Sequence, residues 1–137
     1  MAIFVATDFS VTINGSTALA SYLTQVELTA TATDVTTTAF GSPWVTRVAG
    51  LREGSLTLAF NQDYATTTVD PTLWPLLGTN ATVVIKPTST AVSASNPAYT
   101  AVCLVTELTP VSGTIGDLSV FTVNWPTTGA ITRGTAV

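Results

Sequence analysis

The alternation of large apolar residues between positions 56 and 60 is the feature that most constrains what this chain can fold into. Leu56, Leu58 and Phe60 are separated by single small or polar residues. Because side chains two positions apart point to the same face of a strand, this stretch predicts a strand with one buried face. The glycine-bounded segment 50–54 precedes it, and we expect this segment to be a tight turn.

Six further segments have the alternation or the β-branched composition that is typical of strands. They cover residues 9–13, 21–34, 81–86, 99–108, 118–125 and 130–137. Residues 36–44 are predicted to form a loop, and Asp70-Pro71 and Gly78 mark the start and end of one short helix. About seven strands and one short helix predict a mainly β fold, either a β-sandwich or a partly closed barrel. Composition does not shift along the chain, so residues 1–137 are predicted to form one domain.

The predicted core combines the alternating strand positions with the apolar residues of the short helix. Its members are Leu56, Leu58, Phe60, Leu73, Trp74, Leu77, Phe121 and Trp125. The single cysteine, Cys103, lies in an apolar run, and the chain contains no histidine that could activate a thiol. We therefore expect Cys103 to be buried and unreactive rather than a nucleophile.

Charge is scarce in this sequence. Charged residues make up 9% of the chain, against about a quarter in a typical soluble domain. Monomeric β proteins commonly protect exposed strand edges with charged side chains, above all lysine, and Lys86 is the one lysine here. The composition therefore favours a protein whose edges are covered by neighbouring copies of itself.

The same composition argues against several function classes. The net charge is −4, and the four basic residues (Arg47, Arg52, Lys86 and Arg133) do not cluster, which argues against sequence-specific nucleic-acid binding. The sequence has no evident metal-ligand cluster, phosphate-binding glycine loop or nucleophile–base pair, so we expect neither an enzyme nor a cofactor. The first residues lack the pattern of a signal peptide, and no apolar run has the length of a membrane span. We therefore expect synthesis in the cytoplasm and no membrane anchor.

A series of short turn and strand motifs covers most of the chain. They are YLTQVEL at 22–28, TTAFG at 37–41, GLREG at 50–54, FNQD at 60–63, LWPLLGT at 73–79, PTS at 87–89, NPAY at 96–99, TPVSG at 109–113 and FTVNWP at 121–126. The order and spacing of these motifs resemble those of the major tail tube proteins of long-tailed (siphovirus-type) bacteriophages.

The resemblance implies a β-sandwich subunit that forms hexameric rings, which stack into a hollow tail tube for the passage of double-stranded DNA. It implies a structural protein of the virion tail that is assembled in the host cytoplasm and binds DNA without sequence specificity. The implied partners are further copies of the chain, the tape-measure protein, and the tail terminator and distal tail proteins. The residues that we expect at contacts between subunits or rings are Asp34, Thr36, Thr37, Thr38, Phe40, Trp44, Arg47, Arg52 and Glu53.

Other interpretations remain open on the sequence. The chain could instead be a β-sandwich binding module of a virion, carbohydrate-binding or immunoglobulin-like, with Trp44, Trp74 and Trp125 as a sugar-binding platform. Asp63 and Asp70 could form a carboxylate pair or a calcium site, although roles in a turn and a helix cap fit their spacing better.

The charged residues near the 50–54 segment also allow two interpretations. Arg52 and Glu53, beside Arg47, form either an ion pair at an interface between subunits or a solvated turn with weak pairing. The sequence does not separate these two interpretations.

Overall fold

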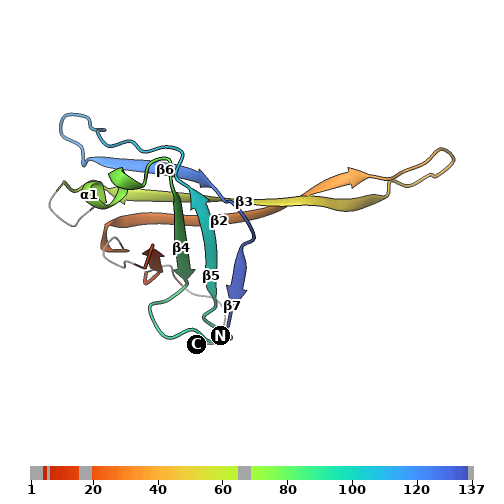
Figure 1. Cartoon of the computed structure of the whole chain (residues 1–137), viewed down its shortest axis with the longest axis horizontal. Coiled ribbons are helices and arrows are strands. Elements are labelled where there is room, and N and C mark those ends of the chain that lie inside the picture. The colour runs from red at the N-terminus through yellow and green to blue at the C-terminus, as the bar shows by residue number, and fades with distance from the viewer. Residues whose placement is uncertain (1–4, 6, 16–19, 65–68, 136–137) are drawn as a thin grey trace.

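The structure of the protein is a computed structural model that describes residues 5, 7–15, 20–64 and 69–135, and its strands form two antiparallel sheets packed face to face (Figure 1). One sheet has the order β1 (Ser10–Ile13), β4 (Asn80–Lys86), β5 (Ala98–Leu104) and β7 (Thr132–Gly134). The other has the order β2 (Leu23–Thr36), β3 (Arg47–Asn61) and β6 (Val120–Pro126). The predicted mainly β fold is confirmed, as a sandwich whose sheets stay open rather than closing into a barrel.

The elements at the end of the chain and the helix are shorter than predicted. The segment 99–108 leaves the sheet after Leu104, and the segment 130–137 contributes β7, with positions 136 and 137 outside the described residues. The helix is a single turn, α1 (Val69–Leu73), which continues as the 3-10 turn η2 (Trp74–Leu76), and a second 3-10 turn, η1 (Ala20–Tyr22), leads into β2. Among the described residues, no helix is long and apolar enough to cross a membrane.

The core lies between the two sheets and is built from cross-strand pairs. In the β3–β6 ladder the opposed pairs are Leu56–Trp125, Leu58–Val123 and Phe60–Phe121. The rings of Phe60 and Phe121 are stacked with their centroids 5.2 Å apart. The facing sheet contributes alternate residues of β1, β4 and β5, among them the fully buried Val83 and Cys103. The period-two alternation seen in the sequence therefore places one face of each sheet in the core.

The predicted core residues divide into two groups. The buried ones are Leu56, Leu58, Phe60, Leu73, Phe121 and Trp125. The prediction was wrong for Trp74 and Leu77, whose side chains are 54% and 43% exposed. The reason is the length of the helix, because a single turn can bury only one face, and Val69 and Leu73 occupy it. Trp74 and Leu77 therefore lie on the outside of the sandwich.

Two strands continue past the sandwich as an arm, which we define as residues 30–53. The arm projects from one end of the molecule (Figure 1), and every residue in it is exposed. Its strands stay paired from Ala30, which lies opposite Gly54, to Thr36, which lies opposite Arg47. The predicted loop 36–44 thus belongs to the tip of a long hairpin, between the end of β2 and the start of β3.

The prediction of a tight turn at residues 50–54 was wrong, because this segment lies inside β3. A close approach of the chain, rather than a turn, favours glycine at position 54. A Cβ atom on Gly54 would lie 2.5 Å from Cδ1 of Ile131 and 3.0 Å from the carbonyl oxygen of Thr29. Glycine therefore lets the segment that leads into β7 pack against the root of the arm.

Candidate functional site

Side-chain hydrogen bonds hold the tip of the arm. The hydroxyls of Thr37 and Thr46 are 2.7 Å apart, and the N–H of Thr46 donates to Oγ1 of Thr38 at 2.8 Å. The Ser42 hydroxyl donates to the carbonyl oxygen of Trp44 at 2.9 Å. Since none of these residues is buried, hydrogen bonds rather than packing define the shape of the tip.

Large apolar side chains are exposed along the arm. They are Val35, Phe40, Trp44, Val45, Val48 and Leu51. Phe40 and Trp44, both expected at contacts between subunits, are 110% and 80% exposed. Single apolar residues are normal on any protein surface, but a series gathered on one projecting element marks an interaction surface.

All the residues predicted to contact neighbouring subunits lie on the arm and are exposed. The sequence divided them among separate features: the end of a strand at Asp34, a loop at 36–44, the segment around Arg47 and a turn at 50–54. The structure joins these features, because they all belong to the paired strands of one hairpin or to its tip. Their role in contacts between subunits stays a prediction.

The charged residues of the arm form one ion pair across the ladder. Nε of Arg47 lies 2.7 Å from Oδ2 of Asp34, and both side chains are more than half exposed. Exposed pairs of this kind contribute at most about 1 kcal/mol. Arg47 is thus paired with Asp34 and not with Glu53, and neither Arg52 nor Glu53 is in an ion pair within the described part of the chain.

The outer face of the β2–β3–β6 sheet is mainly polar and almost uncharged. Its residues alternate with the buried ones and are Gln25, Glu27, Thr29, Ser55, Thr57, Ala59, Asn61, Val120, Thr122, Asn124 and Pro126, so that Val120 and Pro126 are apolar residues at the ends of a mainly polar face. Glu27 is the one charged residue in this set, which contains no Lys or Arg. The face therefore offers hydroxyl and amide groups but no cation that could hold a phosphate.

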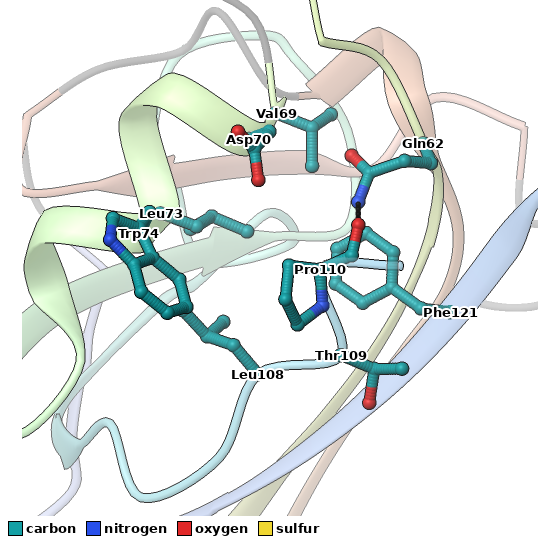
Figure 2. Close-up of a pocket in the computed structure, with 9 residues that line it drawn as sticks. All are labelled: Gln62, Val69, Asp70, Leu73, Trp74, Leu108, Thr109, Pro110 and Phe121. Atoms are coloured by element: carbon teal, nitrogen blue, oxygen red, sulfur yellow. Dashed lines mark hydrogen bonds between the residues drawn. The ribbon is translucent and has the colours of Figure 1, made fainter. Parts of the chain in front are cut away.

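A small cavity lies between α1 and residues 108–110 (Figure 2). Its volume is about 10 Å³, and its lining is mainly apolar, with Gln62 and Asp70 among the polar residues. Nε2 of Gln62 donates to the carbonyl oxygen of Pro110 at 2.9 Å beside the cavity (Figure 2). The space suits about one water molecule, so this cavity cannot hold an organic substrate.

Two grooves of about 590 Å³ lie at the root of the arm and beside β1. The first is lined by small arm residues together with Arg52 and Ile131. The second contains Asp8, whose carboxylate accepts hydrogen bonds from the hydroxyl of Ser89 at 2.7 Å and from its N–H at 3.1 Å. These bonds lower the pKa of Asp8, which makes its carboxylate a weaker base. The contact anchors the chain before β1 to the loop after β4.

The thiol and the carboxylates singled out in the sequence have structural roles. Cys103 is fully buried, and burial raises the pKa of its thiol to about 11, so the thiol stays protonated. The N–H of Asp70 donates to the carbonyl oxygen of Asp63 at 3.0 Å. The prediction that Asp70 caps the helix was wrong, because Asp70 lies within the first turn of α1 (Val69–Leu73). Burial, and after it the Asp63 carboxylate, raises the pKa of Tyr22. Among the described residues, no group of His, Cys, Asp and Glu side chains could hold a metal ion.

A second exposed apolar surface lies at the end of the molecule opposite the arm, and the sequence did not predict it (Figure 1). We define the α1 end as α1, η2 and the loop 105–119. Its exposed apolar residues are Trp74, Val111, Ile115 and Leu118. The loop is held because the Gln62 amide and the Tyr64 hydroxyl both donate to the carbonyl oxygen of Pro110. The available signal was apolar residues in a turn-rich segment with neither helical nor strand periodicity.

Comparison with solved structures finds this fold in a virion. A chain in the structure of the virion of a native gene transfer agent particle matches with a TM-score of 0.69 and 15% sequence identity, over 90% of this chain and 95% of that chain. No protein-family model and no curated protein matches the sequence. The likeness to the virion chain therefore concerns the fold.

Proposed function

We propose that this protein is a structural virion protein and that it is the subunit of a tail tube. Its subunits form hexameric rings, and the rings stack into a hollow tube through which double-stranded DNA passes. The fold likeness to a chain of a gene transfer agent virion supports the virion role. The resemblance of the sequence to siphovirus-type tail tube proteins supports the more specific role, with the protein assembled in the host cytoplasm and located in the virion tail.

The observation that carries this proposal is the arm. A two-stranded hairpin with no packed face is at best marginally stable in water, yet every residue from 30 to 53 is exposed. If neighbouring subunits cover the arm, its apolar side chains leave water, which stabilises both the arm and the assembly. A projecting apolar element is therefore useful to a subunit that must reach a neighbour.

The open sheet edges support lateral association of subunits. β2 and β6 are the edges of one sheet, and β1 and β7 are the edges of the other. Unpaired edges invite pairing with another chain, and this protein has few charges to discourage it. A ring with cyclic symmetry places a neighbouring copy at each such edge and leaves no edge open around the ring.

The outer face of the β2–β3–β6 sheet suits the wall of a DNA channel. Phosphates are held by clustered Lys and Arg, and this face has neither, with Glu27 as its one charge. We assign this face to the lumen, where DNA slides past because nothing retains it. The tape-measure protein would lie in the same lumen, and the tail terminator and distal tail proteins would close the two ends of the tube.

Negative-stain electron microscopy of the concentrated protein tests the proposal. Hollow rings or tubes are the expected result, and uniform monomers at every concentration would contradict it. A glycan-binding screen on the same preparation tests the alternative of a carbohydrate-binding module. Such a module would have to use Trp44 or Trp74, since Trp125 is buried in the core.

A further inference from the structure

We propose that the Glu107 side chain blocks the free edge of β6 in the isolated subunit, and that a strand of a neighbouring copy displaces it when the ring closes. This inference rests on the proposed function, because it names what regulates the lateral contact between subunits. Glu107 is thus a removable cap on a strand edge.

The backbone groups of alternate β6 residues point away from β3. The N–H of Thr127 donates to the carbonyl oxygen of Gly54 at 3.0 Å, just past one end of the strand. At the other end, the N–H of Gln62 donates to the carbonyl oxygen of Ser119 at 3.0 Å. Positions 119 and 127 both face β3 and differ by an even number, so the alternation runs through β6 without interruption. The outward-facing positions are therefore 120, 122, 124 and 126.

Two of these outward positions offer a neighbouring strand no free donor. Pro126 has no backbone N–H, and the N–H of Asn124 donates to Oε1 of Glu107 at 2.9 Å. A proline and a charged side chain at an edge both hinder pairing with another chain. The C-terminal half of this edge is therefore closed in the isolated subunit.

The backbone of Glu107 is held independently of its side chain. Nε1 of Trp125 donates to the carbonyl oxygen of Glu107 at 3.0 Å, and the Trp125 side chain is fully buried. Glu107 itself is exposed. The carboxylate can therefore return to water by rotation of its own side chain, while the loop 105–119 stays in place. Displacing the carboxylate costs no more than one exposed hydrogen bond.

The strand that replaces the carboxylate is β2 of a second copy. β2 is the other edge of the same sheet, so cyclic symmetry brings the β2 edge of one subunit to the β6 edge of the next. Ala30 lies opposite Gly54, whose carbonyl group faces β6, so the backbone groups at position 30, and by alternation at 28 and 26, point away from β3. A carbonyl group on this edge then accepts the N–H of Asn124.

Glu107→Ala removes the cap and keeps the backbone bond to Trp125. Its critical concentration for tube formation, measured by sedimentation, should be about three- to tenfold lower than that of the wild type, because a neighbour no longer displaces a hydrogen bond. Glu107→Gln keeps a side-chain oxygen as acceptor and should lie between the two, and it replaces Glu107→Ala if urea denaturation shows that the latter is unfolded. The matched control is Asp117→Ala, which removes one negative charge from the same loop and should assemble like the wild type.

Hydrogen exchange at the Asn124 amide, followed by nuclear magnetic resonance, tests the displacement. In isolated subunits this amide should exchange about three- to tenfold faster in Glu107→Ala than in the wild type, since its acceptor is gone. Tubes of both proteins are allowed to exchange and are then dissociated for the measurement. In tubes the amide should be protected equally in both, because the neighbouring strand supplies the acceptor.

Three results would overturn the inference. An unchanged or higher critical concentration for Glu107→Ala would show that Glu107 only anchors the loop, and an equal decrease for Asp117→Ala would assign the effect to net charge. An Asn124 amide that exchanges as fast in tubes of Glu107→Ala as in its isolated subunits would show that no neighbour binds it. In each case tubes from the wild-type protein leave the proposed function intact. If neither the wild type nor Glu107→Ala forms rings or tubes, the proposed function fails and the inference fails with it.

Discussion

Replacing residues 32–52 with the dipeptide Asn-Gly should remove the arm and leave the sandwich intact. The ladder sets the join, because Thr31 lies opposite Glu53. The carbonyl group of Gly54 faces β6, since it accepts the N–H of Thr127 at 3.0 Å, so the backbone groups of the adjacent Glu53 face β2. Thr31 and Glu53 are therefore a hydrogen-bonded pair, which a two-residue Asn-Gly turn closes.

The expected change in the free energy of unfolding is within about 1 kcal/mol. Every residue removed is exposed, so no apolar side chain leaves the core. The exposed ion pair between Arg47 and Asp34 is also removed, and such pairs contribute at most about 1 kcal/mol. Surface changes usually stay within about 0.5 kcal/mol, whereas emptying a single buried leucine site costs about 2–5 kcal/mol.

Urea denaturation followed by far-ultraviolet circular dichroism, at concentrations where the protein is monomeric, measures this change. Electron microscopy of the same variant should show no tubes, and the variant Thr33→Ser, which keeps the arm, is the control for tube formation. A loss of more than about 2 kcal/mol would show that the arm supports the sandwich, because it would exceed what exposed residues contribute. Tubes of normal appearance from the armless protein would refute the arm as an assembly element.

Three further expectations concern the body of the protein. Trp125→Ala should lower the free energy of unfolding by about 3–5 kcal/mol, and Trp74→Ala by less than about half of that, because one ring is buried and the other is 54% exposed; equal losses in urea denaturation would contradict this. Gly54→Ala should lower the melting temperature more than Gly50→Ala does, since the new Cβ would lie 3.0 Å from the backbone carbonyl oxygen of Thr29 and displace Cδ1 of Ile131 at the first position, and would lie 3.3 Å from the carbonyl oxygen of Thr33 at the second. The free energy of unfolding should fall as the pH rises above about 9, where the unfolded thiol of Cys103 ionises while the folded thiol, with a pKa of about 11, stays protonated. The slope should not exceed about 1.4 kcal/mol per pH unit, and a slope that Cys103→Ala leaves unchanged would assign the effect to another group.

Local patterns predicted the strands because a strand with one buried face has apolar residues at alternate positions of the sequence. Leu56, Leu58 and Phe60 alternate, and they occupy the inner face of β3 opposite apolar residues of β6. A register shift of one residue would move this whole set to the outer face, so the pattern specifies both the strand and its orientation. The sandwich class follows from several such strands, since each must bury its apolar face against another layer.

The same reasoning failed for residue types that occur in more than one structural setting. The glycines at 50 and 54 suggested a turn, yet they lie in a strand, where Gly54 makes room for Ile131 from a segment distant in the chain. Trp74 and Leu77 suggested core, because apolar helix residues are usually buried. The helix proved too short to bury more than one face.

The candidate site was predicted in part. The residues expected at contacts between subunits all lie on the arm, but the sequence divided them among a strand end, a loop, the segment around Arg47 and a turn, because pairing between strands produces no local pattern where both faces are exposed. The α1 end was not predicted. Its apolar residues at 111, 115 and 118 follow no period, and what gathers them with Trp74 is the packing of the loop 105–119 beside α1.

The sequence by itself determined the strand content, the buried face of each core strand, the burial of Cys103 and the lack of protective charge on the edges. These properties depend on the spacing and type of neighbouring residues, and both are already present within each single strand. The tertiary structure alone decided that β2 and β3 continue past the sandwich as an arm, that the Trp74 side chain is exposed, and that the loop 105–119 with its exposed apolar residues lies at the end opposite the arm. Those features depend on contacts between segments far apart in the chain, and such contacts produce no periodic pattern of apolar residues in the sequence.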